Sequence, residues 1–463
     1  MTRPPFLPAD LWATFPVAAQ AIIAAQHDRL TQLEARVAEL EARLNRTSAN
    51  SSQPPSSDPP HAKPAPPRTP SGKRRGGQPG HPKHDRVLLP PDVILPIKPA
   101  RCRRCCHRLA GDDPAPLVHQ VQEVPEVRPH VTEYRRHRLP CPHCRAVTCA
   151  PLPPDAVGGY GPRVQAITAL LAGGHRLGKR AVSQAMGDLF GLPISPAAVC
   201  DLQATTAGTL APIHQAALSY TRTQPANVDE TGWAQGRGKA WLWAAVTALV
   251  TAFVIRPKRD RAAFDDLVGP SPPVLTTDRY GVYAHLPGDR RQVCWAHLRR
   301  DFQAMIDRRN GGSEIGEELL FHADILFAHW QRVRDGTRGR GWFRRTHGGW
   351  LRTEVRLLLE RGVGCGCAKT AGVCREILAV EGSLWTFAGR DGVEPTNNAA
   401  ERAVRHAVCW RKTSYGTDSE RGSRFVERML TVVASCRQQG RGVLDFLVQA
   451  VTGQKPSLIP QRA

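Results

Sequence analysis

The 463-residue sequence contains no apolar run long enough for a membrane span, and it has few acidic residues for its number of basic ones. Its most apolar stretch covers residues 241–255, and fifteen residues that include two threonines are short for a transmembrane helix. No apolar core followed by a small-residue cleavage site is visible near the N-terminus, so we expect no signal peptide. These absences favour a soluble, cytoplasmic protein over a membrane or secreted one.

The shortage of acids leaves a large positive charge. The 63 Lys and Arg residues outnumber the 41 Asp and Glu residues, which gives a net charge of +22 and a pI near 10.1. Such an excess indicates a polyanionic partner, most commonly nucleic acid, although a solvated basic surface would give the same count. The hydrophobic content of 41% is close to that of globular proteins, and the length favours two to four domains.

The 13 cysteines are an odd number in a long chain, which argues against a disulfide framework. Four of them form two Cys-x-x-Cys pairs separated by 35 residues. Two such pairs can present four thiolates to one structural zinc ion, whereas ordinary reduced cysteines are the alternative. Residues 117–139, between the pairs, alternate in polarity and predict two β-strands. The predicted zinc ligands are Cys102, Cys105, Cys141 and Cys144, and nearby alternative ligands are Cys106, His107, His143 and Cys149.

The N-terminal part predicts one long helix followed by a linker. Residues 20–45 carry apolar side chains at heptad spacing, which favours a parallel coiled coil that pairs subunits, with packing on the chain's own domain as the alternative. Residues 46–90 are dense in Pro, Ser and Gly and predict a disordered linker. The heptad residues are Ile23, Leu30, Val37 and Leu44 at one position and Leu33 and Leu40 at the other.

A helical region is expected over residues 160–220. Within it, a turn around Gly191 separates two helices, and Ser195 followed by Pro196 is a typical start for the second helix. This arrangement resembles a helix-turn-helix that contacts DNA, although such helical hairpins are also common as packing units.

From residue 224 onward the pattern predicts strands and then helices. Helices are expected over 303–390 and from Asn398 to Cys409, so the region fits an α/β domain with a mixed sheet. The predicted strands cover 226–229, 241–247, 251–257, 274–278 and 292–296.

Two of these strands end in an aspartate, Asp229 and Asp278. Carboxylates that converge at strand ends repel each other unless cations lie between them, and magnesium prefers such oxygen ligands. A two-ion site of this kind catalyses phosphoryl transfer, and Glu401 is the candidate third ligand. Each acid also has a structural alternative. Asp229 and Asp278 can cap turns, the neighbouring Glu230 should point to the opposite face, and Asn398 with Glu401 fits a capping box.

Several motifs in one order resemble the transposases of the bacterial insertion sequence 66 family. The resemblance spans nearly the whole chain, from the N-terminal heptads through the two cysteine pairs. Its most specific segments are NSSQPPSSD at 50–58, GGQPGH at 76–81, DETGW at 229–233, CWAHLRR at 294–300 and PTNNAAERAVR at 395–405.

This resemblance implies a ribonuclease H-like core with an Asp-Asp-Glu triad, which maps to Asp229, Asp278 and Glu401. The separation of 123 positions from Asp278 to Glu401 is too long for a bare core, so residues 303–390 would be a helical insertion. The family further implies two magnesium or manganese ions, a multimer that bridges two DNA ends, and small accessory proteins encoded by the same element.

Residues next to the triad supply candidate DNA contacts. Cys294 and His297 form a Cys-x-x-His on the strand that leads out of the core, either as an accessory element or as a buried thiol and a hydrogen-bonded histidine. His406, Trp410 and Tyr415 place rings among the cations that follow Glu401, as expected for stacking on unpaired bases. The predicted DNA-binding cations are Arg299, Arg300, Arg402, Arg405, Arg411 and Lys412.

The sequence therefore predicts a multidomain α/β DNA transposase that acts in the bacterial cytoplasm at the nucleoid. A noncatalytic DNA-binding protein and a plain nuclease of the same fold are the alternatives. The predicted order is a coiled coil at 1–45, a linker at 46–90, a zinc-binding module at 91–155, a helix-turn-helix-like region at 156–222, the first part of the core at 223–302, a helical insertion at 303–390, the helix with Glu401 at 391–425 and a helical tail at 426–463.

Overall fold

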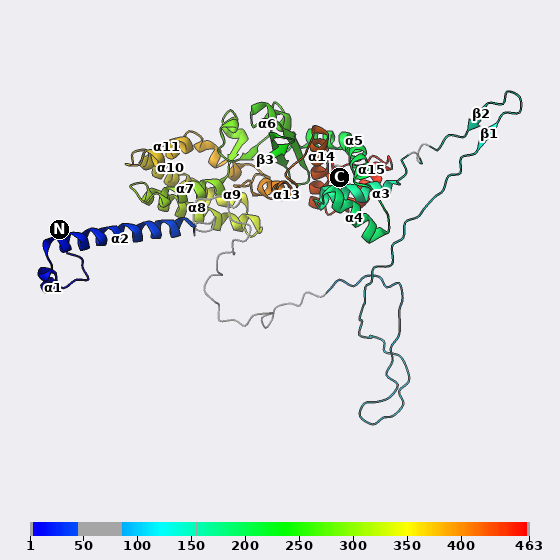
Figure 1. The fold of residues 1–463 in the computed structure, drawn as a ribbon, viewed down its shortest axis with the longest axis horizontal. Helices are drawn as coiled ribbons and strands as arrows, with labels where there is room; N and C mark the ends of the chain where they lie inside the picture. Colours follow the sequence, from blue (N-terminus) through cyan, green and yellow to red (C-terminus); the bar gives the residue numbers. More distant parts are fainter. Residues whose placement is uncertain (1–2, 45–85, 154–155, 157, 461–463) are drawn as a thin grey trace.

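The computed structural model describes residues 3–44, 86–153, 156 and 158–460. A five-stranded sheet lies between two helical regions, one joined to the sheet on each side (Figure 1). The combination of many helices with one mixed sheet agrees with the multidomain α/β class. The expected linker at 46–90 lies mostly outside the described residues.

The central sheet has the order β5-β4-β3-β6-β7. Strands β3, β4 and β5 are antiparallel neighbours, whereas β3, β6 and β7 run parallel. The predicted hairpin is confirmed as β4–β5, but β3 is longer than expected because it continues past Asp229 to a turn at Gly236, whose φ is +57°. The strands are β3 (Ala226–Gln235), β4 (Gly238–Val246), β5 (Thr251–Arg256), β6 (Leu275–Thr277) and β7 (Arg291–Val293).

The two faces of the sheet are covered by different helices. Leu242 and Ala244 of β4 enter a core on one face, and Trp243 and Ala245 enter a second core on the other, as the two-residue period of a strand requires. The first core is closed by α5 (Pro196–Thr221), α13 (Asn398–Ser414) and α14 (Glu420–Gln438), and the second by α6 (Arg261–Val268).

The helical region before the sheet shares the first core. As the sequence predicts, α4 ends where Gly191 adopts a φ of +61°, and Ser195 caps α5 by accepting a hydrogen bond from the Ala198 amide at 3.1 Å. Met186, Leu210 and Phe446 lie in this core, so the C-terminal helix packs with the same region. The elements are α3 (Pro162–Ala169), the π-helix η3 (Leu170–Gly174), α4 (Lys179–Phe190) and α15 (Val443–Val451).

Residues 295–389 form the second helical region, with a core of its own around Trp330 and Phe387. The helices expected over 303–390 are present. However, Cys294 is the N-cap of α7 and His297 lies in its first turn, so the predicted location of this pair on a strand is wrong. The elements are α7 (Trp295–Asp307), α8 (Ser313–Arg334), α9 (Arg340–Phe343), the π-helix η6 (Arg344–Gly348), α10 (Gly349–Val363), α11 (Ala368–Leu378), η7 (Glu381–Leu384) and α12 (Thr386–Gly389).

The described segments before residue 156 (3–44 and 86–153) contain little regular structure apart from two N-terminal helices, α1 (Ala9–Thr14) and α2 (Val17–Leu44), and a short hairpin of β1 (Arg138–Pro140) and β2 (Val147–Cys149). The prediction of two strands over 117–139 is wrong, since only the last two of its residues are in β1. Pro125 and Pro129 interrupt this stretch. Its alternating valines remain exposed, so strand formation here would not be stabilised by burial of an apolar face.

Candidate active site

The strand register of the sheet places Asp229 beside Asp278. In the parallel pair β3–β6, Asn227 lies opposite Thr276, and each aspartate is the second residue after its member of that pair, Asp229 within β3 and Asp278 directly after the end of β6. Adjacent strands are about 4.8 Å apart, and residues two apart on a strand share a face, so the two carboxylates belong to neighbouring positions on one side of the sheet. Asp229 is thus within β3 rather than at its end, and its neighbour β6 is the strand that stops.

Asp229 lies in an environment that disfavours its charge. Burial raises the pKa of this carboxyl well above its ordinary value, and the charges of Glu230, Glu401 and Asp278 raise it further. The contributions of Glu401 and Asp278 show that the three predicted acids share one locality. A buried carboxyl with three carboxylates around it has a strong electrostatic affinity for cations.

Glu401 is held on the first turn of α13, which packs against β3 and β4. The helix begins at an Asn397 cap that makes no side-chain capping bond, so the predicted capping box of Asn398 and Glu401 is wrong. The Glu401 carboxylate instead lies 3.6 Å from His297 Nδ1 and 3.8 Å from an Arg300 nitrogen. The Glu401 side chain therefore lies on the side of α13 that faces α7, and it is not used to cap its own helix.

Asn397 fixes the start of α13 against the sheet. Its side chain is completely buried, its Nδ2 donates to the Val228 carbonyl at 3.5 Å, and its backbone amide donates to Cys294 Sγ at 3.3 Å. The residue before Asp229 is thereby tied to the turn that carries Glu401. Sequence reasoning did not single out Asn397, although the Asn-Asn pair beside a predicted helix start is a recognisable signal.

Asp278 also makes the structural contacts predicted as an alternative. Its Oδ1 accepts a hydrogen bond from the Tyr280 amide at 2.8 Å, and its backbone carbonyl accepts one from Arg291 at 2.9 Å. A carboxylate that caps a turn with one oxygen keeps its other oxygen for a ligand. Capping and metal binding are therefore compatible at this residue.

Glu230 points away from Asp229, as strand alternation predicts. Its side chain is 2% exposed, it pairs with Arg259, and it accepts a hydrogen bond from the Tyr283 hydroxyl. Burial raises the pKa of Glu230 despite these partners. The Arg259 guanidinium lies 3.7 Å from the Tyr280 ring centre, so this network reaches the loop after Asp278. Sequence reasoning missed Arg259 and Tyr283, which lie far from Glu230 along the chain.

Cys294 and His297 have different surroundings. The Cys294 thiol is fully buried, and burial raises its pKa to about 12, so it is a neutral hydrogen-bond acceptor for Asn397. Burial lowers the pKa of His297 to about 4, and its buried Nδ1 has no hydrogen-bond partner. His297 is thus a neutral ring next to the Glu401 carboxylate.

Asp229, Asp278 and Glu401 lie near one another, but their side chains are not arranged around a common point as metal ligands. Among the residues that the structure describes, no three His, Cys, Asp or Glu side chains are arranged as a group that could hold a metal ion. The donor chemistry nevertheless suits a hard divalent cation, because three carboxylates lie near one another, and burial together with the neighbouring carboxylates raises the pKa of Asp229.

Comparison with known proteins identifies the family. Residues 159–424, more than half of the chain, match the family described as "Transposase IS66 family". The chain belongs to the IS66 transposase family. Residues 9–87 match a second family, of unknown function. A protein of Sinorhizobium fredii, named "Uncharacterized protein y4qI", is 26% identical over 240 residues, which cover 46% of this chain and 43% of that protein.

The IS66 match covers all three acids and the basic residues around α13. Of the predicted DNA contacts, Arg402, Arg405, Lys412 and Tyr415 are exposed, but Trp410 is buried and packs edge-to-face against Trp233. The expectation that the Trp410 ring stacks on bases is therefore wrong, because the ring fills the core between α13 and β3.

Three more of the predicted DNA contacts bind the protein itself. Arg411 donates to the Gly232 carbonyl, His406 contacts the Gly173 carbonyl at 3.3 Å, and Arg299 pairs with Asp324 on α8. Arg300 remains partly exposed beside Glu401. The free cations on α13 thus form a narrower set than the sequence suggests.

The two cysteine pairs lie before the matched segment and form the same turn. The amide of Cys106 donates to the Cys102 carbonyl at 2.9 Å, and that of Arg145 donates to the Cys141 carbonyl at 2.8 Å. Both donors have positive φ, 58° and 61°. Hydrogen bonds from amides within each turn, above all from the second cysteine of the pair, lower the pKa of the first cysteine. The structure does not bring the two turns together as one group of ligands in the described part of the chain.

Proposed function

We propose that this chain is a DNA transposase that cuts at the ends of its element and joins them to target DNA. The observation that carries the proposal is the β3–β6 register, which sets Asp229 beside Asp278 while Asn397 ties the Glu401 turn to the same strand. The strand order β5-β4-β3-β6-β7, with an antiparallel hairpin beside three parallel strands, supports a ribonuclease H-like core with residues 295–389 inserted before α13.

Asp229, Asp278 and Glu401 would hold two magnesium or manganese ions. When bound, such ions lower the pKa of an attacking water or 3′-hydroxyl and stabilise the leaving oxygen. The shared locality of the acids and the raised pKa of Asp229 support this ligand set, because cations would relieve the repulsion.

The other residues of the site set its charge and geometry. His297 is neutral and Arg300 lies beside Glu401, so this side of the site offers one fixed positive charge to a phosphate. In the first step, water attacks the phosphorus at the element's end and a DNA 3′-oxygen leaves as a hydroxyl. In the second step, that 3′-hydroxyl attacks a target phosphorus and displaces another 3′-oxygen. The reaction requires no protein nucleophile.

Catalysis is tested with the full chain, magnesium and a duplex that carries a terminal inverted repeat. Asp278→Asn and Glu401→Gln should abolish cleavage and strand transfer and leave DNA binding intact. The matched controls are Asp289→Asn and Glu354→Gln, which neutralise exposed acids elsewhere. Normal cleavage by Glu401→Gln would overturn the triad. Specific binding without cleavage by the parent chain would favour a noncatalytic DNA-binding protein, and cleavage without joining would favour a nuclease.

A structural zinc ion on Cys102, Cys105, Cys141 and Cys144 is the second part of the proposal. The two identical turns, each with amides directed at its first thiol, support it. We expect one zinc ion per chain by elemental analysis, falling to none in Cys102→Ser and unchanged in Cys200→Ser, which lies on α5. Equal zinc content in all three chains would contradict the assignment.

Self-association and DNA binding complete the proposal. Leu30, Leu33, Val37 and Leu40 of α2 are each 43–57% exposed in the single chain, which supports a coiled coil between subunits. The α4–α5 hairpin and the exposed cations of α13 are the proposed DNA contacts. The bacterial cytoplasm at the nucleoid is the proposed location, with accessory proteins of the element as partners. No described helix is long and apolar enough to cross a membrane.

A further inference from the structure

Seven side chains on the inserted helical region form one continuous row. The Phe321 ring contacts His322, which contacts Trp350, with ring centres 5.6 and 6.1 Å apart. His347 follows at 6.5 Å from Trp350 and stacks on His329 at 3.6 Å with an angle of 15° between the planes. The row ends with Trp342, 6.0 Å from His329 and covered by the Arg338 guanidinium at 5.6 Å. We call Phe321, His322, Trp350, His347, His329, Trp342 and Arg338 the ring row.

The end of the ring row with Phe321 and Trp350 lies at the surface, whereas Trp342 at its other end is partly buried against the core. Phe321 is 62% exposed and Trp350 is 41% exposed, whereas the core of this region is built from other rings such as Trp330 and Phe343. His347 reaches the row because the chain forms the π-helix η6 between α9 and α10. The buried Nδ1 atoms of His329 and His347 have no hydrogen-bond partner in the described structure. Such π-helical turns are frequent at functional sites.

The charges around the ring row are of both signs, because cations gather at its Trp342 end while the exposed acids Glu317 and Glu354 lie one helical turn from Phe321 and Trp350. Arg338, Arg344 and Arg345 are exposed and make no ion pair with any carboxylate among the described residues. Arg332 lowers the pKa of both stacked histidines, a smaller effect than that of their burial. A polyanion would satisfy the unpaired arginines at this end of the row directly.

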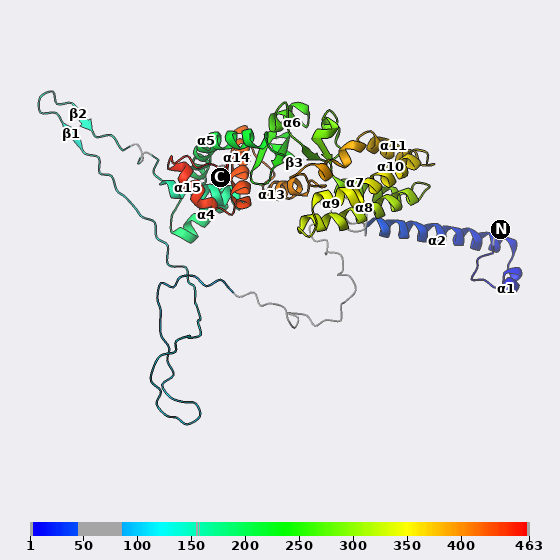
Figure 2. The same cartoon turned by 180° about the vertical axis from the view of Figure 1, so that it is seen from behind.

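The ring row also adjoins the segment that leads to Glu401. Trp330, next to His329 on α8, donates from Nε1 to Glu394 at 3.0 Å, and Arg334 lies 3.7 Å from the same carboxylate. Figure 1 and Figure 2 show α8 and α9 near α13 in projection, and the two Glu394 contacts show that α8 meets the segment that precedes α13. DNA held at the acids can therefore extend onto α8, η6 and α10.

We propose that the ring row binds unpaired bases of the DNA on which the enzyme acts, with Trp350 and Phe321 as stacking platforms and Arg344 and Arg345 as phosphate contacts. Exposed rings between cations are the pattern by which proteins hold single strands, because every base has a face that stacks. The inference rests on the proposed function for the identity of the nucleic acid, but it concerns binding at a different surface.

The test measures the affinity of the full chain by fluorescence anisotropy. The probes are a single strand, the same sequence as a paired duplex, and the duplex with a three-nucleotide unpaired bubble. The double variant Phe321→Ala/Trp350→Ala should weaken single-strand and bubble binding about tenfold and duplex binding less than twofold. Arg344→Ala/Arg345→Ala should weaken binding of all three probes and reduce the salt slope for the single strand by about 1.4.

Matched controls remove the same groups elsewhere. Leu249→Ala deletes an exposed apolar side chain and Arg237→Ala/Lys239→Ala deletes two exposed cations, and both should bind the single strand normally. Phe321→Tyr/Trp350→Phe keeps the rings and should restore binding, which separates stacking from misfolding. Unchanged single-strand affinity in the alanine double variant, an equal loss on the duplex, or a change in subunit number alone would overturn the proposal. Normal cleavage by Glu401→Gln would contradict the catalytic triad and leave this result standing.

Discussion

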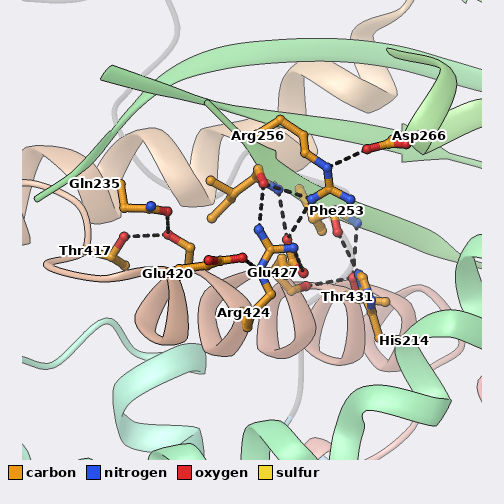
Figure 3. A network of polar contacts seen from close by, with 12 residues as sticks. His214, Gln235, Phe253, Arg256, Asp266, Thr417, Glu420, Arg424, Glu427 and Thr431 are labelled. Atoms are coloured by element: carbon orange, nitrogen blue, oxygen red, sulfur yellow. Dashed lines mark hydrogen bonds and ion pairs between the residues drawn. The ribbon is translucent and has the colours of Figure 1, made fainter. Parts of the chain in front are cut away.

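Asp229 on β3 and Glu427 on α14, which packs against β5, are two carboxylates at the same sheet with opposite surroundings. Burial raises the pKa of both. Glu427 accepts a hydrogen bond from the Ile255 amide at 2.9 Å and pairs with Arg424 at 2.9 Å (Figure 3). The charges around Asp229 are those of other carboxylates, and they raise its pKa further, whereas the arginines around Glu427 lower its pKa. A buried charge with a full set of partners stabilises a fold, and one among like charges indicates a ligand.

Asp229→Asn should produce the largest effect, and on activity rather than stability. The change keeps the shape and removes the charge, so strand transfer should fall at least about a thousandfold, as for loss of a group that stabilises transition-state charge. The melting temperature in a chelator should stay the same or rise, because an uncompensated charge has gone. Parallel activity and melting measurements check this. A large drop in melting temperature would show that Asp229 is structural.

Glu427→Ala should produce the opposite result. Its side chain is 3% exposed, and its removal leaves the Ile255 amide without its acceptor and takes the nearest carboxylate from Arg424, which should destabilise the fold by about 4 kcal/mol in urea unfolding. The control Glu420→Ala removes an acid that is 77% exposed from the same helix and should change the free energy of unfolding by less than about 0.5 kcal/mol. Equal losses in the two variants would remove the contrast.

His214 makes the stability of the region around Glu427 and β5 depend on pH. It is buried against β5 and contacts the Phe253 carbonyl at 2.7 Å, and burial, with the charges of Arg428, Arg424 and Arg256, lowers its pKa from 6.5 to about 4. The unfolded chain therefore takes up this proton near pH 6.5, whereas the folded chain does so only near pH 4. Stability from this group is complete above pH 6.5 and falls by about 3 kcal/mol as the pH drops to 4.

The measurement compares the parent chain with His214→Gln, which keeps a hydrogen-bond donor but does not titrate. The difference between their free energies of unfolding should change by about 3 kcal/mol between pH 7 and pH 4. Taking a difference removes the titration of Glu427, whose raised pKa acts in the opposite direction. A constant difference across this range would contradict the buried, neutral state of His214.

The strands and helices of the sheet region follow from local pattern. The β4–β5 hairpin, the Ser195 cap and the helices after 303 were predictable because periodicity and capping residues act within a few positions. The strands predicted over 117–139 do not form for a nonlocal reason. Their alternating apolar side chains have no other part of the described chain to pack against, so they remain exposed. The sequence indicated Asp229 and Asp278 as the ends of two separate strands, and the family resemblance grouped them with Glu401 as a triad.

The long-range partners of the buried acids Glu230 and Glu427 could not be predicted from sequence. Arg259 and Tyr283 reach Glu230 from 29 and 53 positions away, and Ile255 reaches Glu427 from 172. The sequence gives each residue's chemistry but not which distant group faces it. Trp410 is a further example. Its position among cations in the sequence predicts a DNA contact, whereas in the structure its ring packs on Trp233.

The smallest effects should come from the neutral members of the α14–β5 contact. Glu427, Thr431 and Ser435 accept hydrogen bonds from the amides of alternate β5 residues, ending with Phe253 to Thr431 at 3.1 Å and Thr251 to Ser435 at 3.0 Å. The spacings match, because four helical residues rise about 6 Å and two strand residues about 6.6 Å. The helix thus satisfies the free edge of the sheet, which would otherwise be open to pairing with another chain.

Thr431→Val keeps the shape of the side chain and leaves the Phe253 amide without its acceptor, so the free energy of unfolding should fall by about 1–2 kcal/mol. Hydrogen exchange at the Phe253 amide should accelerate more than at neighbouring β4 amides. The control Thr353→Val removes an exposed hydroxyl of α10 that donates only to the Gly349 carbonyl, and it should be nearly neutral. If Thr431→Val were also neutral, the Thr431 hydrogen bond would add nothing to the α14–β5 contact. The difference between Asp229 and Glu427 would then lie in the partners of the two carboxylates themselves, and not in the row of hydrogen bonds between α14 and β5.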